Sequence, residues 1–197
     1  MEFVKDKTSD VCEEALCKSG RALQFVDDQT DFMCLRVVTR EGWALEHVKK
    51  QTDEICLVAV KSSPSALKDV KNQTKEICME AVKRDGFAIL YVNDKTEELI
   101  IEALRQDGRL LEYIRDQTEE MCWEAIRQNG AAIRYVKNQK AEMCIEAVSN
   151  PKYCHWIWDY NMNDGRRLIG IRDSKIRRLC EIYLLTIESR KDDKNSS

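Results

Sequence analysis

The cysteines are the first candidates for chemistry, because six of the nine recur at multiples of 22 residues. Thiols can form disulfides or bind zinc. Equivalent positions on packed helices lie roughly 8–10 Å apart, whereas a disulfide needs Cα atoms within about 7 Å, and the sequence has no C-x(2)-C pair for zinc. We therefore expect reduced, buried cysteines that pack as small hydrophobic side chains. The six are Cys12, Cys34, Cys56, Cys78, Cys122 and Cys144.

Other groups used in catalysis are scarce. Histidine occurs only as His47 and His155, too little for a triad or a metal cluster, and His47 takes a column that Phe25, Tyr91, Tyr113 and Tyr135 fill in other repeats. The chain has no glycine-rich phosphate loop and no G-x-S-x-G motif. We expect no catalytic residue, no metal site and no cofactor, and therefore a protein that is not an enzyme.

Basic residues form a stronger candidate for binding. A ladder of cations could follow a phosphate backbone, even though the net charge is −3. Cations at helix C-termini also stabilise the helix by themselves, so a solvated edge is the competing interpretation. One set, the basic edge, recurs at Lys18, Arg40, Lys61, Lys83, Arg84, Arg105 and Arg127. A second set lies between repeats, at Lys5, Lys49, Lys71, Arg115 and Lys137.

Aromatic residues supply a third candidate. Trp43, Phe87 and Trp123 stand at positions that are polar in some repeats, so they could anchor a partner peptide if they are exposed. A separate column could serve as a base-stacking platform, but its place beside a valine column predicts core or groove lining instead. That column is Phe25, Tyr91, Tyr113 and Tyr135.

All these columns belong to one repeat of 22 residues, which runs without insertion or deletion over seven copies. Threonine opens six copies and Lys140 opens the seventh. Threonine is a good N-cap, and acids follow it in the first turn. We expect a first helix of about ten residues whose apolar positions share one face. The threonines are Thr8, Thr30, Thr52, Thr74, Thr96 and Thr118.

Glycine recurs after the first helix, at Gly20, Gly42, Gly86, Gly108 and Gly130. We expect it to supply a left-handed residue that ends the helix, with a second helix of two turns packing back on the first. Pro64 replaces the glycine in the third repeat, where we expect Ser63 to cap and Pro64 to begin the second helix. Helices this short need burial from neighbouring repeats.

The pattern changes after residue 150. We expect a helical repeat array over 1–150, a divergent unit and a capping helix over 151–189, and a disordered tail over 190–197. The capping helix should start at Asp173 or Ser174 and cover the last repeat. Arg166 and Arg167 belong to a basic patch in this region. Since no cap precedes the first repeat, we expect its face to be buried in a homodimer.

The chain has no secretory signal layout and no apolar run of membrane length. We expect an intracellular, soluble protein of the cytoplasm, with no membrane partner.

The unit also resembles a known family. The segment Glu80-Ala81-Val82 through Gly86-Phe87-Ala88-Ile89-Leu90-Tyr91 is similar to tandem repeats of unknown function that are abundant in giant viruses of amoebae and in some protists. The resemblance covers about residues 3–150. It implies an α-helical repeat scaffold with no catalytic residue and, for a viral chain, a location in the host cytoplasm or the virion.

The sequence therefore predicts an all-α solenoid of seven two-helix repeats with a C-terminal capping helix. Two functions remain open, a protein-interaction scaffold and nucleic-acid binding along the basic edge. The residues proposed for partner binding are Trp43, Phe87, Trp123, Lys83, Arg105, Arg127, Arg166 and Arg167.

Overall fold

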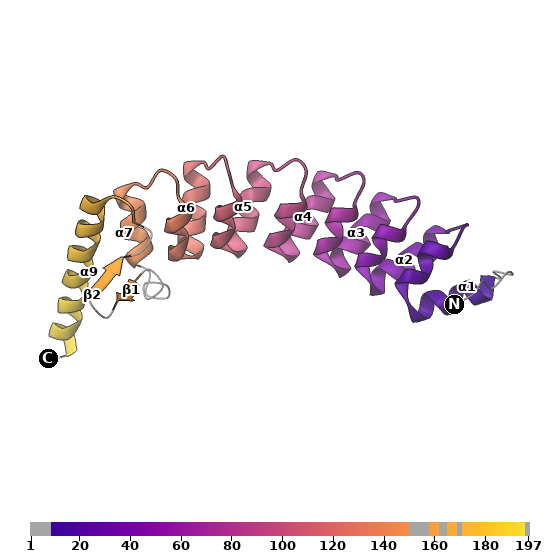
Figure 1. The fold of residues 1–197 in the computed structure, drawn as a ribbon, viewed down its shortest axis with the longest axis horizontal. Coiled ribbons are helices and arrows are strands. Elements are labelled where there is room, and N and C mark those ends of the chain that lie inside the picture. The colour runs from indigo at the N-terminus through magenta and orange to yellow at the C-terminus, as the bar shows by residue number, and fades with distance from the viewer. Residues whose placement is uncertain (1–8, 150–157, 162–164, 169–170, 196–197) are drawn as a thin grey trace. The chain divides into compact units, whose positions relative to one another are not determined.

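The computed structural model describes residues 9–149, 158–161, 165–168 and 171–195 (Figure 1). The chain divides into two compact units, Met1–Leu99 and Ile100–Ser197, and each unit is described by itself. Both units are built from the predicted repeat, in which an α-helix is followed by a 3-10 helix of six residues, labelled η. The structure thus confirms the predicted all-α repeat class.

In the first unit, neighbouring repeats pack in sequence order, α-helix on α-helix and 3-10 helix on 3-10 helix. The α-helices are α1 (Ser9–Lys18), α2 (Asp31–Arg40), α3 (Asp53–Ser62) and α4 (Lys75–Arg84). The 3-10 helices are η1 (Gly20–Phe25), η2 (Gly42–His47), η3 (Pro64–Asp69) and η4 (Gly86–Tyr91).

The second unit continues the pattern, and α5 (Glu97–Gln106) begins in the first unit and ends in the second. It holds η5 (Gly108–Tyr113), α6 (Glu119–Gln128), η6 (Gly130–Tyr135) and α7 (Ala141–Ser149). Its C-terminal part contains β1 (Trp158–Asn161), β2 (Gly165–Leu168) and α9 (Ser174–Asn195).

Threonine begins the α-helices as predicted. The Oγ1 atoms of Thr30, Thr52, Thr74 and Thr118 each accept a hydrogen bond from the backbone N–H three residues later, at 3.3 Å. This bond satisfies one of the N–H groups that a helix start leaves without a partner. The N-cap therefore sets the start of each of these helices locally.

The second helices are 3-10 helices, and this decides which of their residues form the core. With three residues per turn, positions three apart lie on one face. Gly20, Leu23 and Val26 are such a row, and Leu23 is fully buried. The equivalent residues of the next five repeats are also fully buried: Leu45, Leu67, Ile89, Leu111 and Ile133.

The same geometry corrects the prediction for the aromatic column. Phe25, Tyr91 and Tyr113 are 65%, 42% and 55% exposed, so they do not lie in the core. An α-helical period places this column beside the inward valines, but in a 3-10 helix the inward row takes only every third residue. The aromatic side chains therefore reach solvent.

The prediction of a left-handed glycine is wrong. None of Gly20, Gly42, Gly108 and Gly130 has a positive φ. A Cβ atom on Gly108 would instead lie 2.3 Å from the Ala125 oxygen of the next α-helix, and one on Gly42 would lie 2.3 Å from the Ala59 oxygen. Glycine is needed there because consecutive repeats approach backbone to backbone.

Pro64 occupies the first turn of η3 with Ser63 as the N-cap residue, as predicted. The Ser63 side chain makes no capping bond to the backbone, and its Oγ lies 3.0 Å from Ser65 Oγ. The third repeat therefore keeps its 3-10 helix without the glycine.

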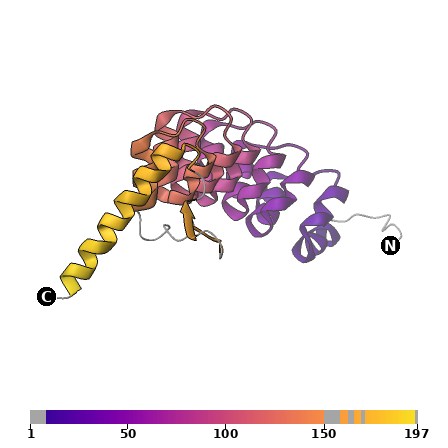
Figure 2. The same ribbon diagram turned by 60° about the vertical axis from the view of Figure 1, so that its left-hand side comes forward.

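The C-terminal helix packs on the last repeat, as predicted. Helix α9, yellow in Figures 1 and 2, contacts α7, and Asp173 Oδ1 caps it by accepting from the backbone of Lys175 at 2.8 Å and Ile176 at 3.1 Å. Helix α9 extends to Asn195, into the segment expected to be a tail.

An additional element precedes α9. Strands β1 and β2 form an antiparallel hairpin in which Tyr160 pairs with Arg166 and Asp159 with Arg167. The sequence analysis did not predict it, because the segment departs from the repeat. Residues 1–8 lie outside the described residues. The homodimer expected through the face of the first repeat stays a prediction. Among the described residues, no helix combines the length and apolar composition that crossing a bilayer requires.

Candidate functional site

A glutamine in the loop between repeats forms the main polar link within each unit. In the first unit, Gln51 Nε2 donates to Asp69 O of the next repeat at 2.9 Å, and its Oε1 accepts from Lys71 N at 2.9 Å. The sequence pattern contains this glutamine but did not reveal its role, since both partners lie about one repeat away. Equivalent bonds to the next repeat are made by Gln29, Gln73 and Gln117.

The cysteine column packs against these glutamines. Cys56 is buried, its thiol lies 3.8 Å from Gln51 Oε1, and burial raises its pKa. The buried column members are free thiols, as the sequence predicted, and Cys180 is a further buried free thiol. Among the described cysteines only Cys17 is exposed. The cysteines of this column therefore have a packing role. Cys12 and Cys154 lie outside the residues whose burial is described.

The glutamine column and the cysteine column are interrupted in the same repeat. Lys95 takes the position of the glutamine, and Ile100 takes that of the cysteine. Lys95 Nζ donates to Val92 O at 2.6 Å, within its own loop. The chain divides into its two units in this repeat, between Leu99 and Ile100.

The loop after Gln139 shows how α9 replaces the next repeat. Arg172 N donates to Gln139 Oε1 at 2.9 Å, across 33 residues instead of the 20 that separate Lys49 N from Gln29. The buried Ile171 then falls in the valine column. Ile171 and Arg172 thus take the places of Val48 and Lys49, but α9 begins three residues after Ile171, whereas α3 begins five residues after Val48.

The basic edge is paired with acids of the same edge. Arg105 Nε donates to Glu124 Oε2 at 3.0 Å, and Arg127 Nη1 donates to Glu124 Oε1 at 3.0 Å. Both bonds lower the pKa of the Glu124 carboxyl, and the bond from Arg105 has the larger effect. In the first unit, Arg84 Nε bonds Glu80 at 2.6 Å, while Lys83 is exposed. Nearby carboxylates therefore neutralise most of the positive charge that was expected to bind a phosphate backbone.

The second set of basic residues, which lies between repeats, links each repeat to the one before it. Lys49 Nζ donates to Asp27 O and Lys71 Nζ to Lys49 O, both at 3.1 Å, and Lys137 Nζ donates to Arg115 O. Each reaches the carbonyl 22 residues earlier. They satisfy backbone acceptors of the preceding repeat.

The structure separates the three aromatic candidates. Trp43 and Phe87 occupy equivalent positions on η2 and η4, whereas Trp123 lies on α6. Phe87 is exposed, and Trp43 and Trp123 are half-buried. Arg127 lies 5.8 Å from the Trp123 ring centre and Arg21 lies 5.9 Å from that of Trp43. Trp123 therefore belongs to a different surface.

Phe87 has two apolar neighbours on η4 that the sequence analysis did not assign to partner binding. Phe87, Leu90 and Tyr91 are 41%, 40% and 42% exposed. Phe87 and Leu90 are three residues apart and therefore share one face of a 3-10 helix. We name these three residues the η4 patch.

Two polar side chains interrupt the aromatic column on η2 and η3. His47 Nε2 and Asp69 Oδ2 are buried atoms that make no hydrogen bond in the part of the chain that the structure describes. Burial raises the pKa of Asp69, and the nearby Glu46 adds to the rise. His47 Nε2 lies 3.5 Å from Glu46 Oε1. A buried carboxylate oxygen without a hydrogen bond, such as Asp69 Oδ2, is costly to the fold.

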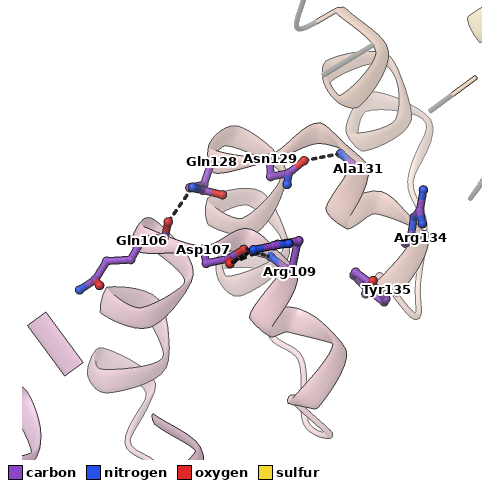
Figure 3. A pocket seen from close by; sticks show the side chains of 8 residues that line it. All are labelled: Gln106, Asp107, Arg109, Gln128, Asn129, Ala131, Arg134 and Tyr135. Atoms are coloured by element: carbon purple, nitrogen blue, oxygen red, sulfur yellow. Dashed lines mark hydrogen bonds and ion pairs between the residues drawn. The ribbon is translucent and has the colours of Figure 1, made fainter. Parts of the chain in front are cut away.

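The second unit contains a surface pocket of about 420 Å³ between η5 and η6 (Figure 3). Asp107 and Arg109 form a bidentate pair in it, with Nη2 to Oδ2 at 2.6 Å and Nε to Oδ1 at 3.0 Å. The bond from Arg109 lowers the pKa of Asp107. Figure 3 shows Arg134 and Tyr135 lining the pocket from η6.

Side-chain amides form the rest of the lining. Gln128 Nε2 donates to Gln106 O at 2.7 Å, and Gln128 Oε1 accepts from Gly108 N at 2.7 Å. Asn129 caps η6, with its Oδ1 accepting from Ala131 N at 3.0 Å. The two Gln128 bonds join consecutive repeats, and the Asn129 bond fixes the start of η6.

The sequence analysis missed this pocket. Its residues come from repeats whose equivalent positions differ, and Arg109 stands where other repeats have Arg21, Trp43, Ser65, Phe87 or Ala131. This variation from repeat to repeat is the signal in the sequence that could have located the pocket. Arg166 and Arg167 lie on β2, apart in sequence from the pocket. Within the described residues, no three His, Cys, Asp or Glu side chains gather as a metal site would require.

Comparison with known proteins supports the repeat. A family model described as Domain of unknown function (DUF4116) matches residues 74–118 and, in a second match, residues 96–139. The second match starts one 22-residue repeat after the first, so this part of the chain fits a repeat family of unknown function. Searches of curated proteins and of solved structures found no match.

Proposed function

We propose that the protein is a non-catalytic helical-repeat scaffold that binds a protein partner through the outer face of its 3-10 helices. One observation carries this proposal. Phe87, Leu90 and Tyr91 remain exposed together on η4, although Ala88 and Ile89 between them are buried. Grouped exposed apolar side chains commonly mark interaction sites.

The alternative, nucleic-acid binding along the basic edge, has weaker support. Arg105 and Arg127 share the carboxylate of Glu124, and Arg84 pairs with Glu80. A phosphate would have to compete with these carboxylates. We therefore propose a protein partner, and a cytoplasmic location, which for a viral chain means the host cytoplasm or the virion.

The patch can be tested by photo-crosslinking in the cell that expresses the chain. A photo-reactive residue at position 90 should capture a partner, while the same residue at the exposed position 61 on α3 should not. Capture should be lost when Phe87→Ser and Tyr91→Ser are introduced together, provided that circular dichroism shows an unchanged fold. Equal capture at both positions, or capture that survives both substitutions, would contradict the proposal.

The alternative has its own test. Titration with random duplex DNA and with RNA at two salt concentrations should show no binding at low salt. Binding whose affinity falls steeply with salt would instead indicate a phosphate track. In that case Arg105→Gln and Arg127→Gln should weaken it, since they remove two exposed cations of the basic edge.

A further inference from the structure

Two tyrosines from consecutive repeats of the second unit lie near Arg109, which lines the pocket between η5 and η6. Tyr113 on η5 is 55% exposed, and Tyr135 on η6 is half-buried and lines the same pocket. The pKa of Arg109 is raised chiefly by its bond to Asp107 and, to a smaller extent, by Tyr135 and Tyr113, so the guanidinium lies near both phenols. The two rings therefore belong to one surface with Arg109.

The spacing of these rings matches the pitch of a polyproline II helix. Tyr113 and Tyr135 stand at equivalent positions of η5 and η6, which pack against each other. Packed helices lie roughly 8–10 Å apart, so equivalent side chains have about that separation. A polyproline II helix has about three residues per turn and rises about 3.1 Å per residue, which gives a pitch of about 9.3 Å. A segment that runs from η5 to η6 can therefore place one turn against each ring.

The polar groups that remain for a ligand in this lining are donors. Asn129 Oδ1 accepts from Ala131 N, which leaves the NH₂ group of Asn129 for a ligand. The fork from Arg109 to Asp107 uses Nε and Nη2, so Arg109 Nη1 makes no hydrogen bond within the described residues. Proline has a carbonyl acceptor and no N–H, and a polyproline II backbone makes no internal hydrogen bonds. Its carbonyls therefore match these donors.

The charged residues at the start of η5 neutralise each other. Arg109 and Asp107 form a bidentate pair, and both carboxylate oxygens already accept from the guanidinium. Gln128 Oε1 is likewise engaged, by Gly108 N at 2.7 Å. This side of the pocket therefore suits an uncharged segment that brings few N–H groups.

We propose that η5 and η6 bind a proline-rich segment of a partner protein in the polyproline II conformation, with Tyr113 and Tyr135 each packing against one turn. The inference rests on the proposed protein-binding function and names the chemistry of a segment recognised at a second surface. Aromatic side chains are a common lining of sites for such segments. The pocket of about 420 Å³ gives room for proline rings beside Tyr135. The segment is extended before it binds, so it loses little conformational freedom.

The test is fluorescence anisotropy of the full chain with two labelled nine-residue peptides with blocked ends, one repeating alanine-proline-proline and one repeating alanine-glycine-serine. The chain should bind the proline peptide and not the flexible one, and salt should change the affinity little because the peptide carries no charge. Tyr113→Ala with Tyr135→Ala should weaken binding by about tenfold or more, since aromatic anchors dominate such interfaces. Tyr183→Ala is the matched control, because it removes an exposed tyrosine of α9 in the same unit, and it should leave binding unchanged.

Amide NMR shifts locate the site in the unaltered chain, so the test does not depend on a double variant that folds. The proline peptide should move the N–H signals of Arg109, Ala131 and Tyr135. Tyr113→Phe with Tyr135→Phe keeps both rings and should retain most of the binding. Equal binding of both peptides, no binding, shifts elsewhere only, or tighter binding of a glutamate-rich peptide or of a ten-nucleotide thymidine strand would each overturn the assignment.

The outcome is separable from that of the proposed scaffold function. Phe87→Ser with Tyr91→Ser should abolish partner capture through the η4 patch and leave the proline peptide bound. If capture depends on the η4 patch and the proline peptide does not bind, the scaffold proposal stands and the assignment of η5 and η6 fails.

Discussion

The side chain of Gln117 donates a hydrogen bond to the carbonyl oxygen of Tyr135, 18 residues later in the chain, at 3.0 Å. The same amide nitrogen lies 3.3 Å from Leu111 O of its own repeat, and its oxygen accepts from Lys137 N at 3.0 Å. One side chain thus satisfies backbone groups of two successive repeats. Stability in repeat proteins depends on such nearest-neighbour interfaces.

Gln117→Ala should therefore destabilise the second unit by about 2 kcal/mol, because it leaves partly buried backbone groups without partners. Urea unfolding followed by circular dichroism measures the change. Asp116→Ala, an exposed neighbour in the same loop, is the control and should have little effect. Equal midpoints for the two variants would contradict the bridging role.

Gly108→Ala should be more harmful than Gly20→Ala. The new Cβ at position 108 would lie 2.3 Å from the backbone oxygen of Ala125, which cannot move without shifting α6. At position 20 the nearest atoms are side-chain atoms, the Glu41 carboxylate at 2.6 Å and Ala44 Cβ at 2.9 Å. The Glu41 side chain is flexible and can move at the loss of its hydrogen bond from Gly20 N. We expect a loss of about 3 kcal/mol for Gly108→Ala and a smaller loss for Gly20→Ala, by urea unfolding. A larger loss of stability for Gly20→Ala than for Gly108→Ala would show that glycine has another role.

Asp69→Asn should stabilise the first unit at neutral pH. Burial raises the pKa of Asp69, so the folded state binds its proton more tightly than the unfolded state does. The charged form therefore costs stability above the ordinary aspartate range, and the cost disappears as the pH falls. Unfolding at pH 7 and pH 3 should show a gain for Asp69→Asn only at pH 7. Asp94→Asn, an exposed control, should show no such difference.

Thiol labelling should distinguish Cys17 from the buried cysteines. Cys17 is exposed, whereas burial raises the pKa of Cys144 to about 12 and that of Cys180 to about 11. Because the thiolate is the reactive form, a maleimide at pH 8 should modify Cys17 in the folded chain, and Cys144 only in urea. Peptide mass mapping identifies the sites. Modification of folded Cys144 as fast as Cys17 would contradict the buried packing.

The same pKa makes stability depend on alkaline pH. Between the ordinary thiol pKa of 9.0 and the raised pKa of about 12, folded Cys144 keeps a proton that the unfolded chain loses. The folded state binds more protons there, so its stability is fully present below pH 9 and falls as the pH rises through this window. Cys144→Ala should reduce the slope of unfolding free energy against pH from 9 to 12.

Local signals in the sequence were sufficient for the repeat itself. The threonine at 22-residue spacing, the acids after it and the spacing of residues such as Ile77, Cys78, Ala81 and Val82 predicted the position of each first helix and its buried face. These signals succeed because capping and amphipathic periodicity act within about one helical turn or two.

The tertiary structure decided the features that depend on a neighbouring repeat. The fit of Gly108 against Ala125, the bridge from Gln117 to Tyr135 and the pocket around Arg109 and Arg134 each join residues one repeat apart. The exposure of Tyr91 and Tyr113 followed from a 3-10 period that composition does not distinguish from an α-helical one. Which atoms of two repeats meet depends on how the repeats stack, and a pattern read within one repeat carries no distance between backbones.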